Sequence, residues 1–165
     1  MKVMNSDNDK NKGRKGERDL LESLIHPMQR NGEDIDYRKP TFTNEPDDGV
    51  DLELKAPHNT GERLERIARG EPVIPEPSHS KILIRVDHKN YEKKIQKPIA
   101  QKFVDDIDKN PNDAEHWLTG GSGLTKGAQE VLDNAPAPTR YFSQDDINTI
   151  NSYYNESEND IESDS

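Results

Sequence analysis

An acid and an amine at the end of one apolar run are candidates for chemistry in this chain. In "KILIRVDHKN", residues 81–90, Asp87 and Lys89 follow apolar residues typical of a buried strand. Side chains alternate along a strand, so Asp87 and Lys89 would share one face and His88 would point to the other. The pair either marks the point where a strand ends in a polar turn or forms half of a metal site in which Lys89 supplies a positive charge.

Two further carboxylates could complete such a site. Asp51 lies in "VDLEL", residues 50–54, and Glu17 lies at the start of the first helical segment. If the two strands are hairpin neighbours, Asp51 and Asp87 can face each other. Carboxylate oxygens from separate elements suit Mg²⁺. Water bound to this metal has a lowered pKa and can attack phosphorus. An adjacent lysine can polarise the attacking water or the scissile phosphate. Chance is the alternative, because the chain has 33 acids and an early Glu17 also favours the helix dipole.

The apolar spacing indicates the elements that must position these residues. A stripe at spacings of three and four predicts a helix within 13–30, which Pro27 could kink or end. Strands are expected at 35–42, 50–54, 81–86, 115–120 and 139–142, and further helices from Pro98 to 107, at 126–135 and at 144–154. Trp117 is expected in the core. This order predicts a mixed α/β domain with one sheet covered by helices.

The domain boundaries follow composition. Residues 1–12 are expected to be a disordered polar lead, 13–154 the domain, and 155–165 an acidic disordered tail that contributes −5 to the charge. Within the domain, the proline-rich segment 56–80 reads as an insertion, mostly loop with one short helix near 62–68. Such a long connection is usually a lid, a binding loop or a disordered insertion.

The overall composition excludes several classes of protein. With 28% hydrophobic and 34% charged residues, the chain has room for one modest core. No cysteine is present, which excludes disulfides and thiolate zinc sites, and the histidines lack a metal-binding spacing. No apolar run is long enough for a membrane span or a signal peptide, so a cytoplasmic location is the default. The net charge of −10 argues against nonspecific phosphate binding by the whole surface.

Four stretches resemble one enzyme superfamily in their order: "KGRKGERDLLESL", "PDDGVDLEL", "ILIRVDHKNYEKKI" and "LTGGSGLTKGAQEVL". Together they resemble the PD-(D/E)xK restriction-endonuclease-like nucleases. The first resembles the start of archaeal-type Holliday-junction resolvases, and the other three resemble Mrr-like type IV restriction endonucleases. The resemblance runs from about residue 13 to 150. It implies a restriction-endonuclease-like core, a mixed sheet flanked by helices, and a divalent-metal-dependent DNA endonuclease.

By this resemblance the catalytic residues are Glu17, Asp51, Asp87 and Lys89, with Mg²⁺ or Mn²⁺ held by the three acids. The sequence departs from the Mrr group in two ways: Asp87 stands where that group commonly has Gln, and 35 residues separate the two aspartates. A rival match lies inside "DDGVDLELKAP". Asp47 or Asp48 with Glu53 and Lys55 resembles the compact site of the MutH and Sau3AI branch.

Other residues are candidates for contacts with DNA rather than for catalysis. The basic lead around Arg14 and Lys15 and the stretch with Lys93 and Lys94 are the best DNA-facing surfaces in an acidic chain. Lys126 lies beside "TGGSG", residues 119–123, which could cradle a phosphate or be a plain loop. No Walker motif is present, so no nucleotide cofactor is expected. The resemblance also implies a homodimer, because cleavage of two strands needs two active sites.

Two hypotheses of different class therefore remain at this stage. The first is a metal-dependent endonuclease that acts on DNA. The second is a non-catalytic, acidic interaction protein on a nuclease-like scaffold, which the charge of −10 and the acidic tail motivate.

Overall fold

Five strands form one sheet in the order β1-β2-β3-β4-β5. The structure is a computed structural model that describes residues 16, 18–38, 49–73 and 80–163. The first three strands are antiparallel neighbours, whereas β3, β4 and β5 run parallel. The strands are β1 (Asp36–Arg38), β2 (Gly49–Pro57), β3 (Lys81–Lys89), β4 (Glu115–Gly120) and β5 (Thr139–Phe142).

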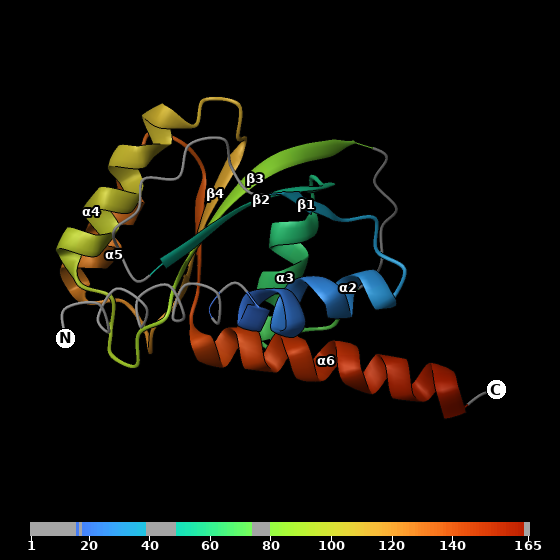
Figure 1. The fold of residues 1–165 in the computed structure, drawn as a ribbon. Helices are drawn as coiled ribbons and strands as arrows, with labels where there is room; N and C mark the ends of the chain where they lie inside the picture. The colour runs from blue at the N-terminus through green and yellow to red at the C-terminus, as the bar shows by residue number, and fades with distance from the viewer. Residues whose placement is uncertain (1–15, 17, 39–48, 74–79, 164–165) are drawn as a thin grey trace, which may run out of the picture.

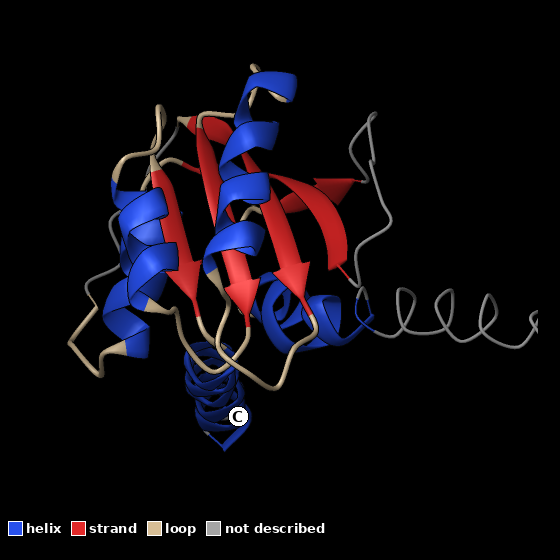
Figure 2. Ribbon diagram, turned by 90° about the vertical axis from the view of Figure 1, so that its left-hand side faces the viewer, coloured by secondary structure: helices blue, strands red, loops and turns tan. Residues whose placement is uncertain are grey.

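Helices cover both faces of this sheet (Figure 1). α4 and α5 lie against one face, and Figure 2 shows them in front of the strands. α2, α3 and α6 lie on the other side. The helices are η1 (Leu21–Ile25), α2 (His26–Arg30), α3 (Thr60–Ala68), α4 (Lys97–Asp105), η2 (Asp106–Lys109), α5 (Lys126–Asp133) and α6 (Gln144–Ser163). The expected α/β class, a mixed sheet flanked by helices, is confirmed.

Each face of the sheet carries its own apolar core. The larger cluster joins the N-terminal helix, α3 and α6 to the sheet through residues such as Leu24, Leu64 and Trp117. The smaller cluster joins α4 and α5 to the sheet through Phe103 and Leu118. Trp117, expected in the core, is fully buried. Neighbouring residues of β4 thus enter opposite cores, as the alternation of side chains along a strand requires.

The N-terminal helix passes through Pro27 instead of ending there. Proline lacks an N–H and its ring clashes with the carbonyl four residues earlier. The helix widens in η1, a π-helix, and the His26 N–H bonds to the carbonyl of Leu21, five residues back. α2 then starts with Pro27 in its first turn, where no intrahelical N–H is needed. The predicted helix is therefore present, and a π-turn accommodates the proline.

The segment 56–80 is more ordered than the sequence predicts. Ala56 and Pro57 still belong to β2, and α3 follows almost at once. Leu64 and Ile67 of α3 are buried in the larger core, so α3 is neither a lid nor a free loop. The short helix expected near 62–68 is thus present as α3, and Pro72 follows its end. Residues 74–79 lie outside the described part of the chain.

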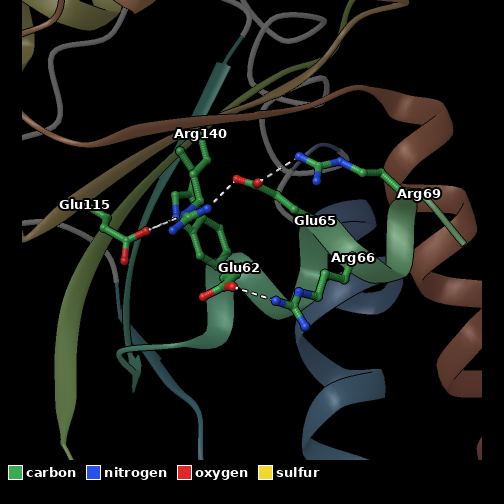
Figure 3. Close-up of polar contacts among 7 residues, drawn as sticks. Glu62, Glu65, Arg66, Arg69, Glu115 and Arg140 are labelled. Carbon is green, nitrogen blue, oxygen red and sulfur yellow. Dashed lines mark hydrogen bonds and ion pairs between the residues drawn. The ribbon is translucent and has the colours of Figure 1, made fainter. Parts of the chain in front are cut away.

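Ion pairs also fasten α3 to the sheet (Figure 3). Arg140 on β5 donates from Nε to Oε1 of Glu115 at 2.7 Å, and its Nη1 pairs with Glu65 of α3. Glu65 accepts a further bond from Arg69, one turn along the helix. Because Gly61 lies against Arg140, where a Cβ would come within 2.4 Å of Nε, α3 approaches the sheet closely at its first turn.

The C-terminal acidic segment also differs from its prediction. Residues 155–163 continue α6, which runs to Ser163 instead of ending near 154. The helix begins at a reciprocal cap: the Asp146 N–H donates to Ser143 Oγ at 3.1 Å, and the Ser143 N–H donates to Asp146 Oδ2 at 3.0 Å. The two reciprocal bonds satisfy backbone N–H groups at the start of α6, as in a capping box. In the described ranges, no helix combines the length and apolarity needed to cross a bilayer.

The glycine-rich loop after β4 packs against the end of β3. Gly120 has φ +98°, and a Cβ there would stand 1.9 Å from the carbonyl oxygen of Lys89. The N–H of Ser122 donates to the Lys93 carbonyl, and the N–H of Ile95 donates to the Gly123 carbonyl. The loop therefore uses these groups to hold the segment that follows Lys89.

Replacing Gly120 with alanine should destabilise the fold strongly. The left-handed backbone alone costs an alanine about 1–2 kcal/mol, and the clash with the Lys89 carbonyl adds to that cost. Gly32→Ala is the matched control, because Gly32 has φ +83° with nothing within 4 Å of an added Cβ. Urea denaturation of both variants should show the larger loss for Gly120→Ala. Equal losses would contradict the close packing.

Candidate active site

The structure brings three of the four predicted catalytic residues together. β2 and β3 pair so that Asp51 lies directly opposite Asp87. Directly opposite residues share a face, with Cβ atoms about 4.5–5.5 Å apart. Lys89 lies two residues further along β3 on the same face, and its Nζ is 3.3 Å from Oδ1 of Asp87. β2 and β3 are thus the antiparallel neighbours that the predicted site requires, despite the 35 residues between Asp51 and Asp87.

Asp87 and Lys89 form a buried ion pair. Their side chains are 7% and 6% exposed, whereas Asp51 is half-buried. Burying charges costs several kcal/mol per ion unless they are paired, and like charges directly opposite each other are destabilising. Lys89 offsets this cost for Asp87. The two opposed aspartates concentrate negative charge at one point of the sheet.

The surroundings of this pair come from both halves of the sheet. On β4, Leu118 lies beside Asp87 and Gly120 beside Lys89. Thr119 donates from its hydroxyl to the backbone carbonyl of Asp87 at 3.4 Å. Since Leu118 belongs to the core under α4 and α5, the candidate site lies on the face that these two helices cover in part.

His88 points to the opposite face, as the alternation predicts. It is buried and its Nδ1 is 2.8 Å from the hydroxyl of Thr119. Burial lowers the pKa of His88 to about 4; the negative charge of Asp19 opposes this effect, and Lys89 adds to it. A neutral imidazole packed in this way has a structural role, in agreement with the interpretation from the sequence.

The remaining site predictions divide into two groups. Glu17, Arg14, Lys15, Asp47 and Asp48 lie outside the described residues. Lys93, Lys94 and Lys126 are described, and all three are exposed. Lys93 and Lys94 lie in the segment after Lys89, and Lys126 begins α5. A Cβ added at Gly127 would contact Lys97 at 3.3 Å, so the first turns of α4 and α5 lie side by side.

A second polar row lies next to the candidate site and was missed by the sequence analysis. Glu53 and Arg85 are register partners, one step along the same face from Asp51 and Asp87. Arg85 is 2% exposed; its Nε donates to Nδ1 of His116 at 2.9 Å and its Nη2 to the Phe103 carbonyl at 2.7 Å. An arginine inside the apolar run "ILIRV" was the signal, because a buried guanidinium must be paired.

Glu53 is fully engaged in this second row. Arg38 of β1 donates from Nε to Oε1 of Glu53 at 2.6 Å. On its other side Glu53 faces the carboxyl of Asp113, and a proton on Asp113 would allow a hydrogen bond between the two acids. Burial, followed by this hydrogen bond and the charge of Glu53, raises the pKa of Asp113 from 3.8 to about 7. Burial and the charge of Arg85 lower the pKa of His116 to about 4.

The donor set of Asp51 and Asp87 fits a hard divalent cation. Mg²⁺ is usually bound by one or two carboxylates and keeps several waters. Within the described residues, no group of three or more His, Cys, Asp or Glu side chains could hold a metal ion. The described part of the site therefore offers a two-carboxylate arrangement, to which the sequence adds Glu17 as an expected third ligand.

The sequence matches no family model and no curated protein. One solved structure that is similar to this chain is described as "DNA modification-dependent restriction endonuclease AspBHI". The TM-score is 0.45 and 12% of the residues are identical, over 95% of this chain and 40% of that one. The chain thus spans less than half of the length of that endonuclease.

The raised pKa of Asp113 predicts a pH-dependent stability. Its folded-state pKa of about 7 lies above the ordinary 3.8, so stability is lost as the pH rises between these values. Asp113→Asn keeps a donor toward Glu53 without ionising. At pH 8 the variant should be more stable than the wild type, on the order of 1 kcal/mol or more, since one pKa unit corresponds to about 1.4 kcal/mol.

Urea denaturation at pH 5 and pH 8 measures this effect. The advantage of Asp113→Asn should appear at pH 8 and shrink at pH 5. Asp108→Asn is the matched control, because Asp108 is exposed on η2, and it should follow the wild type at both values. The same pH dependence in wild type and Asp113→Asn would contradict the protonated pair.

Proposed function

We propose that this protein is a divalent-metal-dependent DNA endonuclease that hydrolyses phosphodiester bonds, with an Mrr-like arrangement of its site. The observation that supports it best is the register of β2 and β3, which sets Asp51 opposite Asp87 with Lys89 3.3 Å away. The order of the sequence motifs implies these residue types, on these two strands, for such an enzyme.

Each side chain has a distinct role in this proposal. Asp51 and Asp87, with Glu17, would hold Mg²⁺ or Mn²⁺. Such an ion would supply an activated water and neutralise charge that develops on the phosphate. Lys89 carries three N–H donors on one cationic group, so it can contact the Asp87 carboxylate and stabilise a phosphate oxygen or the attacking water. Its burial strengthens this electrostatic effect, because the surrounding protein screens charge less than water does.

Local charge allows DNA to approach an acidic protein. The stretch 89–97 contains four lysines and one glutamate, against a net charge of −10 for the whole chain. Lys93 and Lys94 are exposed directly after the strand that carries Lys89. Together with Lys126, Arg14 and Lys15 they form the proposed contacts to the phosphate backbone. Since one site cuts one strand, we further propose that the active form is a homodimer.

The geometry favours Asp87 and Lys89 over the compact frame of Glu53 and Lys55. Glu53 accepts a hydrogen bond from Arg38 at 2.6 Å, so its charge is already matched by a guanidinium. Lys55 is exposed and lies opposite Leu83. Asp51 and Asp87, in contrast, place two carboxylates face to face beside a single lysine.

A non-catalytic role remains a second candidate, because the chain has a net charge of −10 and an acidic C-terminal segment. An acidic protein can bind a basic partner without chemistry. That hypothesis predicts that Mn²⁺ does not bind at the two aspartates. Calorimetric titration of the wild type and of Asp51→Asn with Mn²⁺ separates the two functions, since only a nuclease should show binding that the substitution weakens.

Substitution of Lys89 should abolish cleavage while substitution of Lys55 should not. We expect Lys89→Ala to lower the rate of Mg²⁺-dependent cleavage by about 10²–10³-fold, the usual loss for one electrostatic contact to the transition state. Lys55→Ala is the matched control from the same face of the sheet. Plasmid, methylated and branched DNA are incubated with Mg²⁺ or Mn²⁺, and thermal unfolding confirms that both variants fold.

The outcomes separate the two frames. Loss of activity in Lys55→Ala with retention in Lys89→Ala would assign the site to the compact frame. Equal behaviour of Lys89→Ala and wild type on every substrate would overturn the proposed function.

A further inference from the structure

A pocket of about 470 Å³ opens directly beyond the candidate site. It lies between the segment that follows β3 and the first turn of α4. Its walls include Asn90, Tyr91, Lys93, Lys94, Gln96 and Ile99. A volume of this size is in the range of small-ligand sites. Because Asn90 is the residue after Lys89, the pocket continues the proposed site along the same chain segment.

The walls of the pocket combine apolar, amide and charged groups, and the charged ones include one carboxylate, Glu92, beside two lysines. Tyr91 and Ile99 are partly buried and pack against the core cluster under α4 and α5, so they give the pocket a fixed apolar wall. The side-chain amides of Asn90 and Gln96 are exposed. Gln96 occupies the N-cap position of α4 without a capping bond from its side chain. Lys93 and Lys94 add exposed positive charge.

This combination matches the chemistry of a nucleotide. An unstacked base presents flat faces that stack on an aromatic ring or an apolar wall, and a polar edge that bonds to amides. The phosphates on either side of it pair with lysines. A base inside a duplex keeps both faces covered by its neighbours, so it must leave the stack to enter a concave site.

The pocket is held in place before any ligand binds. Ile95 and Leu124 form an isolated parallel β-bridge. The N–H of Ser122 donates to the Lys93 carbonyl at 3.1 Å, and the N–H of Thr125 donates to the Ile95 carbonyl at 3.0 Å. The glycine-rich loop thus fixes the backbone on one side of the pocket, which lowers the entropy lost on binding.

We propose that this pocket holds one nucleobase that has left the stack, from the DNA strand whose phosphate lies at Asp51, Asp87 and Lys89. This inference rests on the proposed function and specifies its substrate class. The preferred DNA contains an unpaired base near the cleaved bond, as in single strands, mismatches or branches. The apolar wall takes the base, the amides bond its edge, and the lysines hold the neighbouring phosphates.

Binding measurements on the full chain test this proposal. The probes are a fluorescein-labelled 15-nucleotide dT strand and a strand of equal length and charge whose central five positions are abasic. Ca²⁺ replaces Mg²⁺ to suppress cleavage. By anisotropy, the wild type should bind the dT strand about tenfold more tightly, because stacking of one base contributes that order of affinity.

Pocket variants should remove this preference without removing binding. Tyr91→Ala should bind the two strands with similar affinity, because the stacking ring is lost. Gln96→Ala should lower the tenfold ratio, because a bond to the base edge is lost; Gln96 is exposed, so its variant keeps the fold even if Tyr91→Ala does not. Gln101→Ala is the matched control from α4, where Gln101 donates to Asp105 on the exposed face, and it should keep the tenfold ratio.

Two outcomes would overturn the inference. One is a wild type that binds dT and abasic strands equally. The other is a Gln96→Ala variant that keeps the full ratio. Plasmid cleavage in Mg²⁺ is measured in parallel, so that retained cleavage without base preference refutes only the pocket, whereas absence of both binding and cleavage refutes the proposed function as well.

Discussion

β2 and β3 pair over nine residues, with Asp51 opposite Asp87. A shift of one residue in this pairing would turn every side chain of one strand to the other face. The fold resists such a shift because the two faces differ so much. Leu52, Leu54 and Ile84 enter the larger core, while the acids and basic residues of the same strands share the opposite face. Burial of the apolar set therefore fixes the positions of the charged set.

The parallel half of the sheet fixes the other side of the site. β4 runs beside β3 up to the pair of Lys89 and Gly120, and a side chain at Gly120 would collide with the Lys89 carbonyl. From there the glycine-rich loop bonds to the backbone after Lys89, which carries the exposed lysines and the pocket beyond them. This glycine-rich loop therefore supports the backbone after Lys89, and its role as a phosphate cradle stays a prediction.

Local signals in the sequence were enough for most of the elements and for the pairing of two strands. Apolar spacing located the strand with Asp87 and the helices that begin after Thr125 and Ser143. The motif order predicted that Asp51 would lie opposite Asp87, as it does. Features that depend on distant partners were not visible. Pro27 gave no sign of the π-turn, and nothing local showed that α3 is tied to β5 by Arg140. The partnership of Glu53 with Arg38 and Asp113 also needs the fold.

The two polar rows on this face of the sheet differ in a way that bears on function. In the second row each buried charge has a direct partner: Arg38 binds Glu53, and Arg85 binds His116 and lies 4.4 Å from the ring centre of Phe103. Such a row is explained by packing alone.

The row of Asp51 and Asp87 is not explained by packing. A buried ion pair is often no more stabilising than apolar residues of similar volume, and opposed carboxylates add repulsion. Stability alone therefore gives little reason for two facing acids beside a buried lysine, and this is the ground on which the proposed metal and phosphate site rests. For the same reason we propose Asp87 and Lys89, rather than Glu53, as the place of the chemistry.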